Sequence, residues 1–110
     1  MTDSAPLSPL HGKVALITGA GQGIGQGIAF SLAKRGVSIV AVGRTLGKCE
    51  KTVADIAARF GGKAVAIEYD LSDLDGLDEL MGRAVDAFGR LDILVNNAVT
   101  TTINTIMETS

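Results

Sequence analysis

The chain has 110 residues, of which 46% are hydrophobic, and a formal net charge of −2. This length suits one small domain, and the apolar content excludes an intrinsically disordered chain. The mildly acidic balance, with basic residues scattered along the chain, argues against nucleic acid as a partner. No apolar run reaches the roughly 18 to 20 residues of a membrane span, and residues 1–12 lack the basic start and apolar core of a signal peptide. We therefore expect a cytoplasmic protein with no membrane partner.

Residues 1–12 are interpreted as a leader, after which strand and helix patterns alternate. Four short apolar runs predict strands because they lack polar alternation, which is typical of parallel strands covered on both faces. Three stretches with apolar residues at helical spacing separate these runs. In chain order, the expected elements are a strand at 14–17, a helix at 24–33, a strand at 37–42, a helix at 46–60, a strand at 64–67, a helix at 74–88 and a strand at 91–95.

Several single residues mark the ends and the packing of the expected helices. Gly36, Gly61 and Gly89 follow the three helices and predict left-handed C-caps, because glycine adopts that conformation without strain. Ser72 and Asp75 have the spacing of a capping box that would open the third helix. The single cysteine, Cys49, cannot form an internal disulfide, and its helical setting predicts a small buried side chain without chemistry.

The order of the elements predicts the fold class. A β-α-β-α-β-α-β pattern indicates an α/β fold, here a Rossmann-like doubly wound parallel sheet. Right-handed crossovers arrange its strands in the order 3-2-1-4. The ligand crevice is then expected at the carboxyl ends of the first and fourth strands.

A glycine-rich segment, Thr-Gly-Ala-Gly-Gln-Gly-Ile-Gly at residues 18–25, joins the first strand to the first helix. Glycine permits both the sharp turn and a close approach of backbone N–H groups to a pyrophosphate, and the helix adds partial positive charge. The spacing of Gly19, Gly23 and Gly25 differs from strict G-x-G-x-x-G, and no Lys-Ser/Thr pair follows, which disfavours a P-loop. Glycine loops also occur as plain turns, so spacing alone leaves both interpretations open.

The residue after the second strand bears on which dinucleotide is preferred. An acidic side chain at this position would accept hydrogen bonds from the adenosine ribose, but the chain has Gly43 and then Arg44. A positive charge suits a 2′-phosphate, so the expected cofactor is NADP(H) in preference to NAD(H). Lys48, one turn later, is a second candidate. The alternative is that both cations are solvated residues at the start of a helix.

Polar residues follow the third and fourth strands. Asp70 precedes Leu71 directly after the third strand, where a carboxylate can accept from an adenine amino group or serve as a charge at a helix N-terminus. Asn96, Asn97 and Ala98 end the fourth strand, where paired amides can satisfy loop backbone groups beside the nicotinamide ribose. Either amide alone would be uninformative.

Taken together, the glycine-rich segment, Asp70-Leu71 and Asn96-Asn97-Ala98 resemble the short-chain dehydrogenase/reductase family from about Lys13 onward. The resemblance implies a dinucleotide cofactor, a small-molecule alcohol or carbonyl substrate and a homo-oligomer in the complete protein. It also implies a pyrophosphate site, an adenine site, a 2′-phosphate site and a nicotinamide-side ribose site. By this resemblance the pyrophosphate site consists of Gly19, Gln22, Gly23, Ile24 and Gly25. The adenine site consists of Asp70 and Leu71, and the 2′-phosphate site is Arg44. Asn97 and Ala98 belong to the nicotinamide-side ribose site. Val99 stands where the family's motif usually has glycine.

The catalytic residues of that family cannot be placed in this chain. Its members use a Ser, a Tyr and a Lys four residues after the Tyr, whereas the only tyrosine here, Tyr69, is followed at that distance by Asp73. We expect Tyr69 to pack, because the neighbouring Glu68 would not lower a tyrosine pKa toward neutrality. His11 is expected to be an ordinary exposed residue. No catalytic residue and no metal site are assigned.

Residues 13–110 are therefore expected to be a partial NADP-binding Rossmann domain, truncated near the start of a fourth helix and incomplete at the carboxyl side of its sheet. Exposed apolar surface and an open strand edge predict low stability or self-association. The first function hypothesis is the cofactor-binding segment of an NADP-dependent oxidoreductase, inactive by itself. The alternative is a non-catalytic nucleotide-binding or protein-interaction module that functions at this length.

Overall fold

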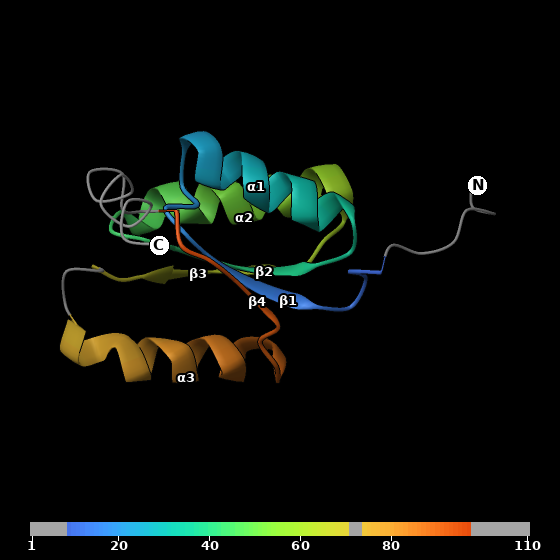
Figure 1. Ribbon diagram of the computed structural model, residues 1–110. Helices are drawn as coiled ribbons and strands as arrows, with labels where there is room; N and C mark the ends of the chain where they lie inside the picture. Colours follow the sequence, from blue (N-terminus) through green and yellow to red (C-terminus); the bar gives the residue numbers. More distant parts are fainter. Residues whose placement is uncertain (1–8, 71–73, 98–110) are drawn as a thin grey trace, which may run out of the picture.

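The computed structural model describes residues 9–70 and 74–97, which form a parallel sheet with helices on both faces (Figure 1). The strands are β1 (Val14–Thr18), β2 (Ser38–Gly43), β3 (Ala64–Glu68) and β4 (Ile93–Val95). Their order is β3-β2-β1-β4, with every neighbouring pair parallel, which confirms the predicted topology. The α-helices are α1 (Gly23–Lys34), α2 (Leu46–Phe60) and α3 (Leu77–Phe88).

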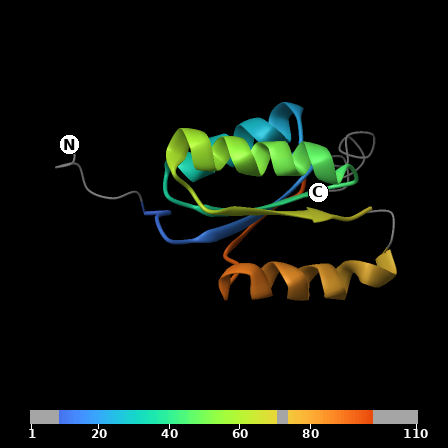
Figure 2. The ribbon, with the colours of Figure 1, turned by 180° about the vertical axis from the view of Figure 1, so that it is seen from behind.

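The layers follow from the alternation of side chains along β1 and β2. Helices α1 and α2 lie side by side on one face of the sheet, and α3 lies on the other (Figures 1 and 2). Ala15 and Ile17 of β1 belong to the apolar cluster that includes residues of α1 and α2, whereas Val14 and Leu16 belong to the cluster that includes residues of α3. Both faces of β1 are therefore buried, which explains why its sequence is a continuous apolar run.

Small residues set the distance between α1 and the sheet. Gly25, Ala29 and Ala33 are the buried residues of α1, at a spacing of four along the inner face of the helix. Short side chains on this face allow the helix axis to approach β1 and β2 closely. In α2 the inward face includes Cys49, which is 1% exposed, and burial raises the pKa of its thiol. The structure thus confirms the predicted buried cysteine.

The helix ends agree in part with the sequence. Gly36, Gly61 and Gly89 all have positive φ, as expected for left-handed caps. The third helix begins later than predicted, because residues Leu74–Gly76 form a 3₁₀ turn and α3 starts at Leu77. Ser72 of the expected capping box lies outside the described residues.

The fourth strand is shorter than its apolar run suggested. It begins at Ile93 and not at Leu91, because Asp92 turns its carboxylate back onto the sheet. Oδ2 of Asp92 accepts a hydrogen bond of 2.9 Å from the Val14 N–H, while the Asp92 N–H donates to the Val14 carbonyl. Arg90 donates to both carboxylate oxygens, at 2.8 and 2.7 Å. The start of β4 is thus fixed to the start of β1 by a side chain.

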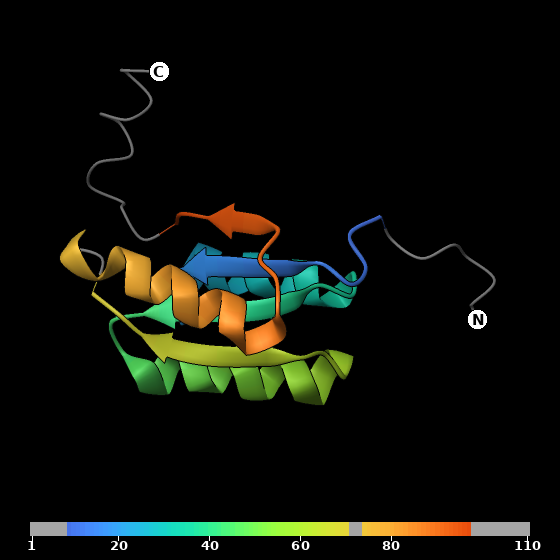
Figure 3. The ribbon, with the colours of Figure 1, turned by 90° about the horizontal axis from the view of Figure 1, so that it is seen from below.

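Among the described residues, large apolar side chains of β4 and α3 are exposed. Leu94 is 56% exposed and Val85 of α3 is 40% exposed. Figure 3 shows that, within the described part of the chain, α3 crosses the face of the sheet without covering β4. None of the described helices has the length and apolar character needed to cross a membrane.

Asp92 should make the stability of the fold sensitive to acid. Hydrogen bonds from Arg90 and from the Val14 N–H hold the pKa of Asp92 below its ordinary value. A carboxyl with a depressed folded-state pKa stabilises the protein above its unfolded-state pKa of about 4, and this contribution is lost as the pH falls through the lower folded-state pKa. We expect the free energy of unfolding of Asp92→Asn to decrease less than that of the unmodified protein as the pH falls below about 4. Urea denaturation at several pH values measures this difference.

The matched control is Asp86→Asn, which removes the same charge from an exposed position on α3. This variant should retain the acid dependence of the unmodified protein. Equal acid dependence in the two variants would show that Asp92 does not contribute through these hydrogen bonds.

Candidate functional site

The glycine-rich segment forms a turn at the carboxyl end of β1 and leads into α1. Gly19 and Gly23 have φ values of 66° and 61°, a conformation that favours glycine. Gln22 precedes the helix in an extended conformation and its side chain makes no capping hydrogen bond, and no acidic residue lies in the first turn. The first N–H groups of a helix have no partner within it, and the helix dipole makes this end positive. The turn therefore combines backbone donors with partial positive charge.

At Gly25 a side chain would clash with the backbone of the glycine-rich turn. A Cβ atom at this position would overlap the Gly19 carbonyl and lie 2.7 Å from Nδ2 of Asn97. The first turn of α1 is therefore in close contact with both the glycine-rich turn and the segment after β4. Glycine at this position brings three separate parts of the chain to one place.

A threonine hydroxyl joins the ends of β1 and β4. Oγ1 of Thr18 accepts a hydrogen bond of 2.7 Å from the Asn97 N–H, and it lies 3.2 Å from Oδ1 of Asn96 and 3.3 Å from the Val95 carbonyl. Thr18 is 4% exposed, so the hydroxyl is one of the few polar groups in the core. This role of Thr18 was not predicted from its place in the glycine-rich segment. The structure thus brings Thr18, Gly25 and Asn97 together at the carboxyl ends of β1 and β4.

Arg44 lies on the surface directly after β2. Its side chain is exposed, and among the described residues it makes no hydrogen bond or ion pair. The Tyr69 N–H donates to the Gly43 carbonyl at 2.9 Å, so the segment that carries Asp70 after β3 lies next to the end of β2. Asp70 is exposed. Arg44 and Asp70 thus follow neighbouring strands at the carboxyl edge of the sheet.

Lys48 is exposed, and its side chain reaches the glycine-rich turn. Its Nζ donates a hydrogen bond of 2.7 Å to Oε1 of Gln22. The structure also reveals a residue that the sequence analysis missed, Thr52, whose hydroxyl donates to the Ala20 carbonyl at 3.0 Å. The available signal was a polar residue within the apolar stripe of α2, between Cys49 and Ile56.

Of the remaining predicted residues, one packs against the core and the others lie outside residues 9–70 and 74–97. Tyr69 is half-buried and packs against the apolar cluster on the α3 face, as expected. Leu71, Ala98 and Val99 lie outside the described residues, and so does any contact they make. Among the described residues, no group of three histidine, cysteine, aspartate or glutamate side chains could hold a metal ion.

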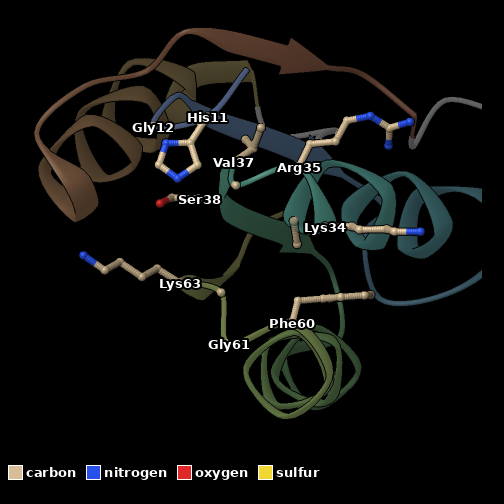
Figure 4. Close-up of a pocket in the computed structure, with 12 residues that line it drawn as sticks. His11, Gly12, Lys34, Arg35, Val37, Ser38, Phe60, Gly61 and Lys63 are labelled. Carbon is tan, nitrogen blue, oxygen red and sulfur yellow. The ribbon is translucent and has the colours of Figure 1, made fainter. Parts of the chain in front are cut away.

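A groove at the opposite end of the molecule is separate from this site (Figure 4). It lies where α1 and α2 end, and its lining includes His11, Gly36 and Lys63. His11 is exposed, as predicted, with its ring against Gly36. Figure 4 shows Lys34 and Lys63 pointing in different directions, so their charges do not converge on one point. The groove contains none of the predicted cofactor-binding residues.

Comparisons with known proteins agree with this architecture. A hydroxynaphthalene reductase-like protein, Arp2, from Metarhizium acridum is 46% identical over 99 residues, which cover 90% of this chain and 37% of that protein. L-sorbose reductase from Gluconobacter frateurii, solved with NADPH and L-sorbose, is 37% identical with a TM-score of 0.78, over 83% of this chain and 35% of that one. The chain therefore spans about a third of these relatives.

A third relative was solved with NAD in place of NADPH. The 3-oxoacyl-[acyl-carrier protein] reductase from Brucella melitensis, in complex with NAD, is 36% identical with a TM-score of 0.73, over 78% of this chain and 33% of that one. The model of the short chain dehydrogenase family matches residues 13–110, which include every described strand and helix. The chain therefore belongs to the short-chain dehydrogenase/reductase family of oxidoreductases.

Proposed function

We propose that the chain forms the NADP(H)-binding part of an oxidoreductase that interconverts an alcohol and a carbonyl compound by hydride transfer. The observation that carries the proposal is the close contact of Gly25 with the Gly19 carbonyl and the Asn97 amide at the carboxyl ends of β1 and β4. The reductase names of the relatives support an enzyme over a non-catalytic interaction module. The substrate is a small molecule, and the protein is a cytoplasmic homo-oligomer in this proposal.

The pyrophosphate of the cofactor would lie over the turn between β1 and α1. Backbone N–H groups at the start of α1 would donate to its oxygens, and the helix dipole would favour its negative charge. In this arrangement the residues that line it are Gly19, Gln22, Gly23, Ile24 and Gly25. Ile24 is 75% exposed, and a bound cofactor would cover it.

The adenosine end would lie across the carboxyl ends of β2 and β3. Asp70 and the neighbouring Leu71 would contact the adenine, and Arg44 would pair with a 2′-phosphate. The guanidinium of Arg44 is available for this role because it is exposed and unpaired among the described residues. Family members were solved with NADPH and with NAD, so family membership does not select the cofactor, and we assign that selection to Arg44.

Asn97 and Ala98 would lie beside the nicotinamide-side ribose. When bound, a nicotinamide dinucleotide supplies or accepts the hydride. Thr18 would hold the Asn97 backbone in place through its hydroxyl, so that the amide side chain faces the start of α1. We assign no catalytic acid or base to this chain, because Tyr69 packs against the core.

Replacing Arg44 should change the choice of cofactor. We expect Arg44→Ala to weaken NADPH binding roughly 10- to 150-fold, the loss that corresponds to one charge-assisted hydrogen bond. Binding of NADH should be unchanged because it carries no 2′-phosphate. Fluorescence titration with both cofactors measures the ratio. Lys34→Ala, which removes the same charge at the far end of α1, is the control and should leave the ratio unchanged. A parallel loss for both cofactors in Arg44→Ala would contradict 2′-phosphate recognition.

A methyl group at Gly25 should abolish cofactor binding. The new Cβ of Gly25→Ala would collide with the Gly19 carbonyl and the Asn97 amide, so the turn and the helix would have to separate. The control is Gly27→Ala in the same helix, where a Cβ meets nothing within 4 Å. That change should leave binding intact and stabilise α1 by up to about 1 kcal/mol. Thermal unfolding and NADPH titration test both variants, and equal NADPH affinity in the two would refute the proposed cradle.

A further inference from the structure

Three consecutive residues of the glycine-rich turn contact helix α2, although α2 is a separate element of the fold. The Ala20 carbonyl accepts from the Thr52 hydroxyl at 3.0 Å. A Cβ on Gly21 would lie 2.7 Å from Cβ of Lys48, so the backbone of the turn lies directly against the helix. Gln22 accepts from Lys48 at 2.7 Å. The turn is therefore attached to α2 along its length.

Thr52 is the buried member of this set. It is 0% exposed, and it lies on the buried face of α2 between the apolar residues Cys49 and Ile56. Its hydroxyl accepts a hydrogen bond of 3.2 Å from Nε2 of Gln26 on α1 and donates its one proton toward the Ala20 carbonyl. The same hydroxyl lies 3.3 Å from the Lys48 carbonyl of its own helix. One side chain thus links α1, α2 and the turn between β1 and α1.

The peptide groups of Ala20 are held from two sides. Its N–H donates to the Val42 carbonyl of β2 at 3.3 Å, and its carbonyl is bonded to Thr52. Ala20 is itself 0% exposed, so a carbonyl without Thr52 would be a buried acceptor without its partner. The turn would then relieve this cost by moving. Helix α2 begins two residues after Arg44, so the helix that contacts the turn also follows directly after the proposed adenosine side of the site.

We infer that Thr52, supported by Gln26, is a positioning residue that holds residues Ala20–Gly21–Gln22 against α2 and so sets the geometry of the pyrophosphate-binding turn relative to the adenosine-binding end. This inference rests on the proposed dinucleotide site. Thr52 itself would not touch the cofactor, because its hydroxyl is buried between the two helices and the turn. Its effect on binding passes through the Ala20 carbonyl.

The test compares two variants of Thr52 in the protein at its natural length. Thr52→Val keeps the branched shape and removes the hydroxyl, whereas Thr52→Ser keeps the hydroxyl. Affinities are measured for NADPH and for adenosine 2′-monophosphate, which lacks a pyrophosphate. We expect Thr52→Val to weaken NADPH about 5- to 30-fold, the range for one lost hydrogen bond, and to leave adenosine 2′-monophosphate unchanged. Thr52→Ser should restore NADPH affinity.

Each other result is decisive. Unchanged NADPH affinity in Thr52→Val, equal losses for both ligands, or failure of Thr52→Ser to restore binding would overturn the positioning role. If Thr52→Val does not fold, Gln26→Met is tested in its place, because a methionine side chain cannot donate a hydrogen bond to Thr52. A loss of affinity confined to NADPH is again the expected result. An unmodified protein that binds neither NADPH nor NADH overturns the proposed function, a result distinct from failure of the Thr52 variants alone.

Discussion

The close approach of α1 to the turn that precedes it is the constraint on which the rest of the site depends. It is possible only because Gly25 has no side chain, which lets the helix lie against the Gly19 carbonyl and the Asn97 amide. The positive end of the helix, the glycine-rich turn and the loop after β4 then meet at one edge of the sheet. In the proposed function, this contact combines three common features of α/β proteins into one cofactor site.

Polar contacts then hold the close arrangement that the absence of a side chain at Gly25 permits. Thr18 holds the start of the loop after β4 through the Asn97 N–H, and Thr52 holds the turn through the Ala20 carbonyl. Both hydroxyls are buried, where a polar group is costly unless its hydrogen bonds are satisfied, so each favours one geometry of its neighbours. One buried threonine therefore holds the segment after β4 and another holds the turn, while Gly25 lets the turn, α1 and that segment meet.

Sequence reasoning predicted the parallel sheet because burial on both faces leaves a plain record, the uninterrupted apolar runs of β1 and β2. It also placed Gly25 and Asn97 at adjoining strand ends, since parallel strands end at the same edge. It missed the late start of β4, where the Asp92 carboxylate bonds to β1, and the role of Thr52, whose partner lies 32 residues away. Contacts of this kind depend on tertiary packing and leave no periodicity in the sequence.

The most direct test of the account is a calorimetric titration of the unmodified protein, at its natural length, with NADPH and with NADH. The account predicts saturable binding of one cofactor per chain, with NADPH bound more tightly because Arg44 is available for its 2′-phosphate. Absence of binding by a folded sample would contradict the assignment of a cofactor site to the carboxyl ends of β1 and β4. Tighter binding of NADH would contradict the role given to Arg44.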